Sequence, residues 1–272
     1  MFLQITIPHT DTFIQEILIA RMEDIGYDGF QQEGSNLYAF INKDQFNAPY
    51  LEELLSPHAL SWSSLELPDK NWNEEWEKNF QPVIVGTFCA IRASFHVPIR
   101  DVLHQLVITP KMSFGTGHHA TTYMMIQAME SLDLKGKRVL DFGTGTGVLA
   151  ILAERLGSTD ILAIDNDEWS IRNTAENITE NAAVAIRVEK METLPANGQF
   201  DVILANINRH IILKELPGMG QQLRKDGVIL LSGLLEDDFQ IIEKEALKNE
   251  LPISGRLTKN GWICLKVTRE SK

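Results

Sequence analysis

A glycine-rich turn is the first feature of this sequence with residues suited to chemistry. The run VLDFGTGTGV places Gly143, Gly145 and Gly147 directly after an apolar stretch. Where a strand turns into a helix, backbone N–H groups are left without partners, and glycine lets a ligand approach them closely. Several nucleotide-like ligands bind at such turns. The turn therefore predicts a nucleotide-type site and leaves its ligand open.

The spacing of the glycines and two nearby acids narrow the choice of ligand. A dinucleotide-binding turn reads G-x-G-x-x-G, whose last position is valine here, and no P-loop pattern is present. Asp141 lies inside the turn, where it would repel a pyrophosphate but suit a ligand with an amine and a sulfonium. Asp165 ends the next predicted strand, where its carboxylate can accept hydrogen bonds from ribose hydroxyls. These residues favour S-adenosylmethionine (SAM) as the cofactor, bound by Asp141, Gly143, Gly145, Gly147 and Asp165. Another nucleotide or a purely structural turn are the alternatives.

A second polar cluster precedes the glycine turn. Residues 109–122 read TPKMSFGTGHHATT, a glycine-containing loop followed by Thr121 and Thr122, either of which can cap a helix. Taken alone, the two histidines fit an ordinary capped loop better than a catalytic group. Because the loop leads into the helix before the glycine turn, chain order places it over the cofactor pocket.

Several motifs resemble the PrmA family, the methyltransferases of ribosomal protein eleven of the large subunit. Residues 114–122, FGTGHHATT, resemble the family's FGTGxHxTT signature, and NWNEEW at 71–76 resembles its W-x-x-x-W stretch. Further counterparts are LANI at 204–207, SGL at 232–234 and GW at 261–262. The resemblance covers residues 70 to 267, whereas the first sixty residues match only in size and strand–helix pattern.

The resemblance implies a class I SAM-dependent methyltransferase that modifies lysine side chains and the N-terminal amine of its ribosomal protein substrate. The family's cofactor contacts carry over to Thr122, Gly143, Asp165 and Asn206. The chain departs from the family pattern at Lys111, Ser113 and Asn208–His210, and these departures bear on substrate access rather than on cofactor binding.

Asn206 and His119 are the candidate catalytic residues. Methyltransferases of amides and adenines often carry (N/D)-P-P-(Y/F) at the position of Asn206, and the run ANIN here disfavours such planar substrates. A lysine amine, with a free pKa of ~10.4, must lose its proton before it can attack a methyl group. An entrance to the active site that excludes water would favour the neutral amine, and we expect Asn206 to line that entrance. His119 is a possible proton acceptor, although a structural role is the simpler interpretation.

The elements that must position these residues form a regular pattern from Thr121 onward. A helix over Thr121–Leu132 precedes a strand over Arg138–Phe142, and strands then alternate with helices of ten to fifteen residues. This alternation predicts an α/β fold, a doubly wound, mostly parallel sheet of the class I methyltransferase type. Two last strands meet at Lys259-Asn260-Gly261, where Asn-Gly favours a tight hairpin, so we expect an antiparallel C-terminal edge.

The front of the chain predicts a small α+β domain of the ferredoxin-like type. A strand at Phe2–Pro8, a helix over about Asp11–Ile25, two strands around Gly34 and a helix over Ala48–Leu55 follow one another. We expect a substrate-recognition domain over residues 1–62, a linker packed through its tryptophans over 63–79, and the methyltransferase domain over 80–272.

Composition sets limits on the partners. The formal net charge is −12, and residues 1–65 carry nine acids against Arg21 and Lys43, which disfavours a direct nucleic-acid partner and suits a basic protein. A merely solubilising acidic surface is the alternative.

Cys89 and Cys264 lie far apart, and no metal-ligand spacing is present. No apolar run reaches the ~18 residues of a membrane span, and no secretory signal begins the chain, so we expect a cytoplasmic protein.

Two rival functions remain at this stage. One is a class I methyltransferase that acts on another protein or on a small amine. The other is a SAM-binding assembly factor without catalysis. An NAD oxidoreductase is disfavoured because the third glycine is misplaced.

Overall fold

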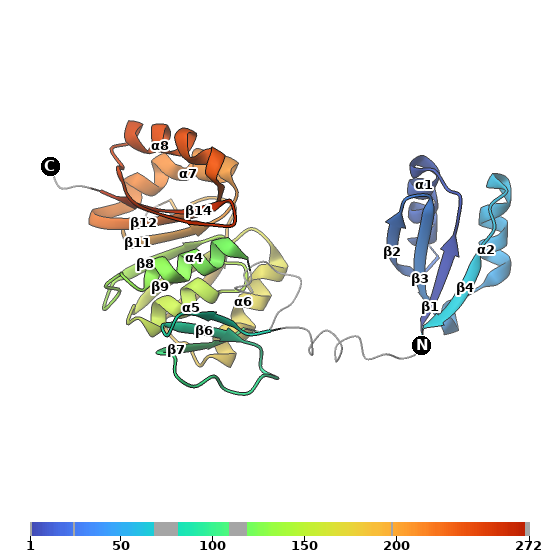
Figure 1. Cartoon of the computed structure of the whole chain (residues 1–272), viewed down its shortest axis with the longest axis horizontal. Coiled ribbons are helices and arrows are strands. Elements are labelled where there is room, and N and C mark those ends of the chain that lie inside the picture. The colour runs from blue at the N-terminus through green and yellow to red at the C-terminus, as the bar shows by residue number, and fades with distance from the viewer. Residues whose placement is uncertain (1, 24, 68–80, 109–118, 197, 270–272) are drawn as a thin grey trace. The chain divides into compact units, whose positions relative to one another are not determined.

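The chain folds into two compact units, Met1–Phe80 and Gln81–Lys272 (Figure 1). The computed structural model describes residues 2–23, 25–67, 81–108, 119–196 and 198–269.

The first unit is a four-stranded antiparallel sheet with two helices. Its elements are β1 (Phe2–Ile7), α1 (Thr12–Glu23), β2 (Tyr27–Glu33), β3 (Asn36–Asn42), α2 (Ala48–Leu55) and β4 (Ser63–Leu67), with single turns of 3₁₀ helix at Lys43–Gln45 and Ser56–His58. The strand order is β2-β3-β1-β4, and every pair is antiparallel. A βαββαβ chain in this order has the ferredoxin-like topology that the sequence predicts.

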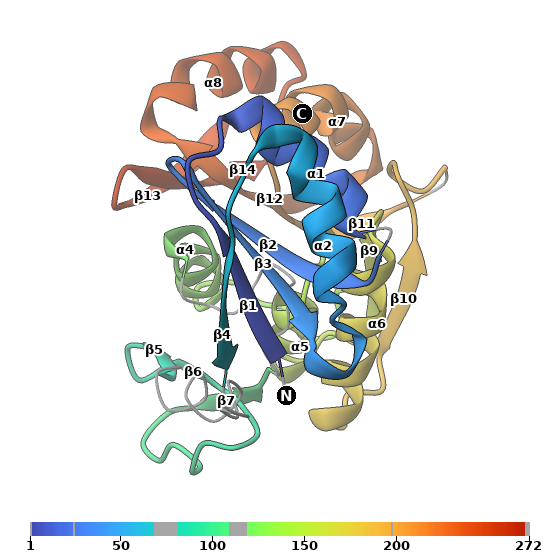
Figure 2. The ribbon, with the colours of Figure 1, turned by 90° about the vertical axis from the view of Figure 1, so that its right-hand side faces the viewer.

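One face of this sheet is apolar because its strands alternate. In β1, Leu3, Ile5 and Ile7 are buried, and the residues between them are only partly covered. The buried side packs against Leu18 of α1 and Leu51 of α2, so both helices cover the same face (Figure 2).

The fourth strand corrects the predicted linker. β4 pairs with β1 from Phe2↔Leu67 to Thr6↔Ser63, so the sheet extends to residue 67 within the range expected to be a linker. Trp62 packs edge-on against Phe46, with ring centroids 5.6 Å apart, and belongs to the core of the first unit. The rest of the expected linker, 68–79, lies outside the described residues.

The second unit begins with a three-stranded sheet, ordered β5-β6-β7, made of β5 (Val83–Val85), β6 (Cys89–Arg92) and β7 (His104–Val107). The helices that follow are α4 (Ala120–Met129), α5 (Val148–Arg155), α6 (Glu168–Glu180), α7 (Arg209–Gln222) and α8 (Phe239–Lys248), with a 3₁₀ turn at Glu236–Asp238. The remaining strands are β8 (Arg138–Phe142), β9 (Asp160–Asp165), β10 (Ile186–Lys190), β11 (Phe200–Asn206), β12 (Leu223–Leu235), β13 (Ile253–Lys259) and β14 (Trp262–Thr268).

The seven strands from β8 onward form one sheet with the order β10-β9-β8-β11-β12-β14-β13. The first five are parallel, and β14 runs antiparallel to both of its neighbours. The predicted fold class is thus confirmed, and β14 and β13 form the predicted antiparallel C-terminal edge, with β14 next to β12. The strand order reverses between β8 and β11, which is where open α/β sheets bind their ligands, outside the carboxyl ends.

Both faces of the large sheet are buried. Val139, Ala163 and Leu204 contribute to a core shared with α4, α5 and the small sheet. Their neighbours in sequence, such as Leu140 and Ile203, belong to a second core shared with α7 and α8. Strands covered on both sides read as continuous apolar runs, which is why they are recognisable in the sequence.

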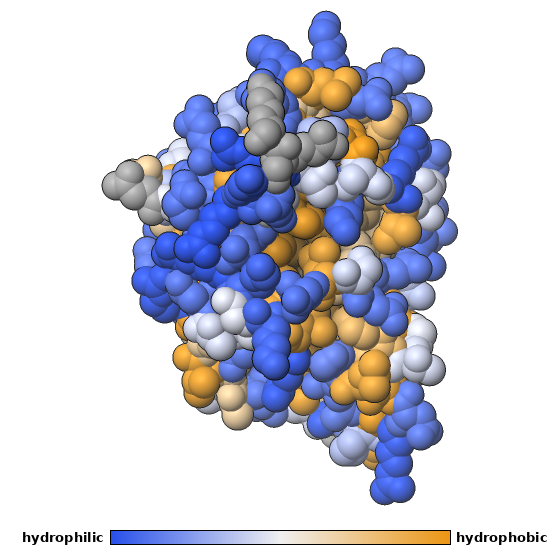
Figure 3. Space-filling view, turned by 90° about the vertical axis from the view of Figure 1, so that its left-hand side faces the viewer, coloured by the Kyte–Doolittle hydropathy of each residue, from blue (hydrophilic) through white to orange (hydrophobic). Residues whose placement is uncertain are grey.

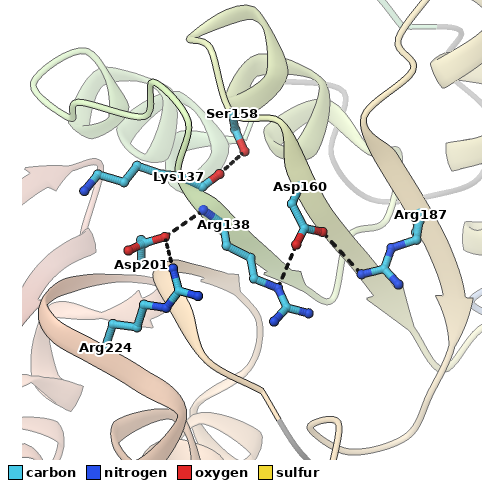
Figure 4. Close-up of polar contacts among 7 residues, drawn as sticks. All are labelled: Lys137, Arg138, Ser158, Asp160, Arg187, Asp201 and Arg224. Atoms are coloured by element: carbon cyan, nitrogen blue, oxygen red, sulfur yellow. Dashed lines mark hydrogen bonds and ion pairs between the residues drawn. The ribbon is translucent and has the colours of Figure 1, made fainter.

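Salt bridges join several strands of the large sheet (Figure 4). Asp201 of β11 accepts hydrogen bonds from the backbone N–H of Arg138 at 2.8 Å and from the Arg224 guanidinium at 2.9 Å. Asp160 of β9 lies 2.9 Å from Arg138 Nε and 3.3 Å from Arg187. One carboxylate therefore ties β8, β11 and β12 together, and the other ties β8, β9 and β10.

Most of the surface seen in Figure 3 is hydrophilic, and hydrophobic residues gather in a hollow bordered by hydrophilic ones. Among the described residues, no helix is long and apolar enough to cross a membrane. The strands β4 and β5 and the helix α8 were not predicted from the sequence.

Candidate functional site

A cavity of about 430 Å³ opens where the carboxyl ends of β8, β9 and β11 meet. Five of the predicted site residues line it, namely His119, Gly143, Gly145, Asp165 and Asn206. Three others, Thr122, Asp141 and Gly147, are not among its lining residues.

The glycine turn forms the floor of the cavity, and its conformation depends on close backbone approach. Gly143 has φ +77°, and a Cβ there would lie 2.3 Å from Cγ2 of Ile207. The turn is held from behind, because the Gly145 carbonyl accepts a hydrogen bond from the Thr174 hydroxyl of α6 at 2.9 Å. Gly147 is the N-cap of α5 and completes the turn. These contacts hold the backbone of residues 143–145 in the turn conformation.

Asp141 lies beneath the turn rather than in the cavity. Its side chain is buried, and Oδ2 accepts hydrogen bonds from the Thr144 hydroxyl at 2.7 Å and from the backbone N–H of Ala150 at 3.2 Å. Burial raises the pKa of this carboxyl to about 7, against the opposing effect of these two bonds. Asp141 thus braces the turn against α5.

Asp165 occupies the end of β9 and faces the cavity. Its Oδ2 accepts a hydrogen bond from the Gly145 N–H at 2.9 Å, and its Oδ1 accepts one from the Asp167 N–H at 3.0 Å. A carboxylate can accept about four hydrogen bonds, so capacity remains for a diol in the cavity.

Asn206 carries a buried acceptor without a protein partner. Its Nδ2 donates to the Thr122 hydroxyl of α4 at 3.2 Å, which orients the amide. Its Oδ1 is buried and makes no hydrogen bond to the described residues. A buried acceptor of this kind costs free energy unless a ligand satisfies it. Thr122 therefore orients the Asn206 amide.

His119 is the N-cap of α4, whereas Thr121 or Thr122 was the predicted cap. The helix starts at Ala120, and His119 Nδ1 accepts the Thr121 N–H at 3.4 Å and lies 2.8 Å from the Thr121 hydroxyl. The cap is thus the imidazole, and Thr121 and Thr122 lie inside the helix. The ring also packs edge-on against Trp262, with centroids 4.7 Å apart.

Several residues that line the cavity were not predicted as site residues, although Gly233 and Trp262 lie in the SGL and GW motifs that resemble the family. Met191 and Glu192 follow β10, Gly233 lies within β12, and Trp262 begins β14. The position of Met191 and Glu192 after a strand was the signal that could have identified them, because carboxyl ends of parallel strands share one edge. Lys111, Ser113 and residues 114–118 of the signature loop lie outside the described residues, as do Trp72 and Trp76.

The residues of the cavity fit S-adenosylmethionine. The lining residues that the structure describes include Asp165 and Glu192 but no lysine or arginine, so the cavity suits a cation and not a pyrophosphate. The buried Asn206 Oδ1 needs a hydrogen-bond donor, and the cofactor and an amine both supply donors. Among the described residues, no group of three or more His, Cys, Asp or Glu could hold a metal ion.

Known proteins are similar to this chain over most of its length. The family model for "Ribosomal protein L11 methyltransferase (PrmA)" matches residues 16–270. A ribosomal protein L11 methyltransferase from Porphyromonas gingivalis is 39% identical over 264 residues, covering 94% of this chain and 91% of the relative. One from Bacteroides fragilis is 37% identical over 269 residues and covers 96% of both chains.

Solved structures agree with the fold. A ribosomal protein L11 methylase from Lactobacillus delbrueckii subsp. bulgaricus is 29% identical with a TM-score of 0.66, covering 71% of this chain and 100% of that chain. A methyltransferase from Pyrococcus furiosus, 18% identical with a TM-score of 0.53, covers 61% of this chain and 90% of its own, and shares the fold. The chain therefore belongs to the ribosomal protein L11 methyltransferase family and is a class I, S-adenosylmethionine-dependent methyltransferase.

Proposed function

We propose that this chain transfers methyl groups from S-adenosylmethionine to amines of the large-subunit ribosomal protein L11, namely lysine side chains and the N-terminal amine. The similarity to relatives named for that substrate, which extends over 94% of this chain, carries the proposal. A basic substrate also complements the acidic first unit. Because ribosomal proteins are assembled in the cytoplasm, we place the reaction there.

The cofactor site is built from the floor and one wall of the cavity. In this proposal the Gly143 and Gly145 backbone approaches the ligand, Asp165 accepts its ribose hydroxyls, and Glu192 adds negative charge to the wall. Asp141, Gly147 and Thr122 support this arrangement from outside the cavity. When bound, the cofactor supplies a methyl group on a positively charged sulfur.

The acceptor amine is aligned by Asn206. Its free Oδ1 accepts an N–H of the neutral amine, which points the nitrogen lone pair away from Asn206. The thioether that departs is a good leaving group, so alignment and exclusion of water supply most of the catalysis. The apolar lining from Phe142, Ile207 and Ile211 favours the neutral amine over the ammonium.

His119 is assigned a positioning role in this scheme. Its Nδ1 is engaged at the start of α4, and its ring lies against Trp262, so it fixes the first turn of α4 beside the cavity. Its use as a proton acceptor remains the alternative, and a pH–rate profile of His119→Ala separates the two. An unchanged shape of the profile supports positioning.

The test is mass spectrometry of purified ribosomal protein L11 after incubation with this chain and S-adenosylmethionine. We expect mass increments of whole methyl groups, mapped by peptide analysis to lysines and to the N-terminus. Asn206→Ala is the matched variant. Because Asn206 is also a predicted cofactor contact, calorimetry first measures the cofactor affinity, and methyl transfer at saturating cofactor should still fall, since the amine is no longer aligned. If the wild-type chain binds the cofactor but leaves L11 unmodified, the proposal is wrong. The chain is then a cofactor-binding assembly factor or a methyltransferase with another substrate.

A further inference from the structure

The wall of the cavity contributed by Trp262 is aromatic. Trp262 follows the hairpin turn between β13 and β14, where Asn260 has φ +53° and Gly261 has φ +78°. The turn is anchored, because the Glu236 N–H donates to the Gly261 carbonyl at 3.0 Å. The Trp262 ring meets the His119 ring edge-on, and the Phe142 ring also lines the cavity. A fixed hairpin thus presents an indole to the site.

The first turn of α4 links this indole to the acceptor oxygen of Asn206. His119, the N-cap of α4, contacts Trp262, and Thr122, three residues later, holds the amide of Asn206. Lys259 on the same hairpin lies over the Tyr123 ring, 4.2 Å from its centroid, and adds a second contact between hairpin and helix. The oxygen and the indole are therefore held in one rigid frame and line the same cavity.

The two groups recognise different methylation states of an amine. A neutral primary amine has two N–H donors and a monomethyl amine has one, so Asn206 Oδ1 can hold either. A neutral dimethyl amine has none, and only its methyl groups remain to be recognised. Aromatic rings bind methylated nitrogens by packing against the methyl groups and, in the charged form, through cation–π attraction.

We propose that Trp262 determines how many methyl groups this enzyme adds to one amine, by holding the methylated acceptor that Asn206 no longer can. This inference rests on the proposed function. In each round the nitrogen lone pair forms a bond to the methyl carbon as the carbon–sulfur bond breaks, and that bonding pair stays on sulfur. The resulting ammonium releases one proton to water before the next round, and the third transfer yields a quaternary ammonium with no proton to lose.

The experiment compares the wild type with Trp262→Leu and Trp262→Phe on L11 peptides whose acceptor lysine is unmethylated, monomethylated or dimethylated at the start. For Trp262→Leu we expect the rate on the dimethyl acceptor to fall by roughly 3- to 30-fold more than the rate on the unmethylated one, because the indole no longer packs on the two methyl groups or attracts the positive charge that develops on nitrogen. Trp262→Phe keeps a ring and should lie between leucine and the wild type. Final products should shift toward lower methylation states.

Controls separate recognition from folding. Trp169→Leu removes an indole that is 66% exposed on α6 and is absent from the lining of the cavity, so its ratio of rates should match that of the wild type. Thermal unfolding and cofactor affinity are measured for every variant, and the ratio of rates on two acceptors cancels any loss of folded enzyme. Equal losses on all three acceptors would overturn the role of Trp262 while leaving the proposed function intact. A wild type that modifies none of them, nor intact L11, would overturn the proposed function itself.

Discussion

At the scale of single residues, the site separates two acids that look alike in the sequence. Asp141 and Asp165 each lie at the end of an apolar run, in β8 and β9 respectively, yet Asp165 faces the cavity and Asp141 is buried under the turn. From the sequence, both acids and the glycines between them could be assigned to the cofactor site. The sequence could not predict which acid is buried, because that depends on how α5 packs over the turn.

Asp141 should make stability depend on pH. Its pKa in the folded chain is raised to about 7, whereas an unfolded Asp titrates near ~3.9, so the folded state binds the proton more tightly between these values. The stability contributed by this group therefore falls as pH rises from about 4 to about 7. Asp141→Asn can still accept from Thr144 and Ala150 but never ionises. Calorimetric melting from about pH 5 to pH 8 should show a smaller loss of stability in the variant than in the wild type. Parallel melting curves would contradict the assignment.

At the scale of elements, β11 serves the site at one end and the scaffold at the other. Asn206 ends the strand in the cavity, and Asp201, near its start, ties the strand to its neighbours. The apolar runs and helix spacing predicted this strand and the parallel sheet around it. They did not predict β4, whose Ser-Ser-Leu-Glu-Leu sequence is largely polar and is held by pairing with β1. α8 was missed as well: its apolar side packs on α7 in a chain region that reads as charged.

Asp201 should contribute more stability than Asp160, although each touches two strands besides its own. The Asp201 side chain is 18% exposed, and its loss leaves the Arg138 N–H without its acceptor. We expect Asp201→Ala to cost about 1–3 kcal/mol of unfolding free energy. Asp160 is 46% exposed and makes ion pairs only, so Asp160→Ala should cost about 0–1 kcal/mol. Urea denaturation measures both, and equal costs would show that the backbone hydrogen bond to Asp201 is unimportant.

At the scale of the whole molecule, chemistry and charge reside in different units. The second unit contains the described cavity, while residues 1–65 carry a large share of the negative charge. The uneven distribution of negative charge along the chain could be predicted from the sequence composition. Composition could not say where the first unit ends, because residues 63–67 become a strand only through long-range pairing with β1.

The acidic first unit should attract the substrate by charge. Asp44, Glu52 and Glu53 are exposed, and replacing all three by Asn or Gln should raise the KM for L11 by roughly 3- to 10-fold at low salt, with kcat little changed. The difference should shrink as salt shortens the Debye length from ~10 Å at 0.1 M. Steady-state kinetics at two salt concentrations measures this effect.

The matched control neutralises three exposed acids of the second unit, Glu130, Glu180 and Glu189. Both triple variants change the net charge equally, so a difference between them reports the location of the charge. If the two raise KM to the same extent, only overall charge matters and the first unit has no special role in capture.

Ile207 has a consequence for how this site can change over evolution. A Cβ at position 143 would meet the Ile207 side chain, whereas a Cβ at position 233 would lie 2.2 Å from the Ile207 carbonyl oxygen, a backbone atom. A smaller residue at 207 makes room for the first substitution and none for the second. A change at position 143 therefore needs a change at position 207 as well, and its φ of +77° would still strain any residue other than glycine, so the segments that follow β8 and β11 are coupled. At position 233 the obstacle is the backbone of residue 207, so no change of the side chain at 207 relieves it.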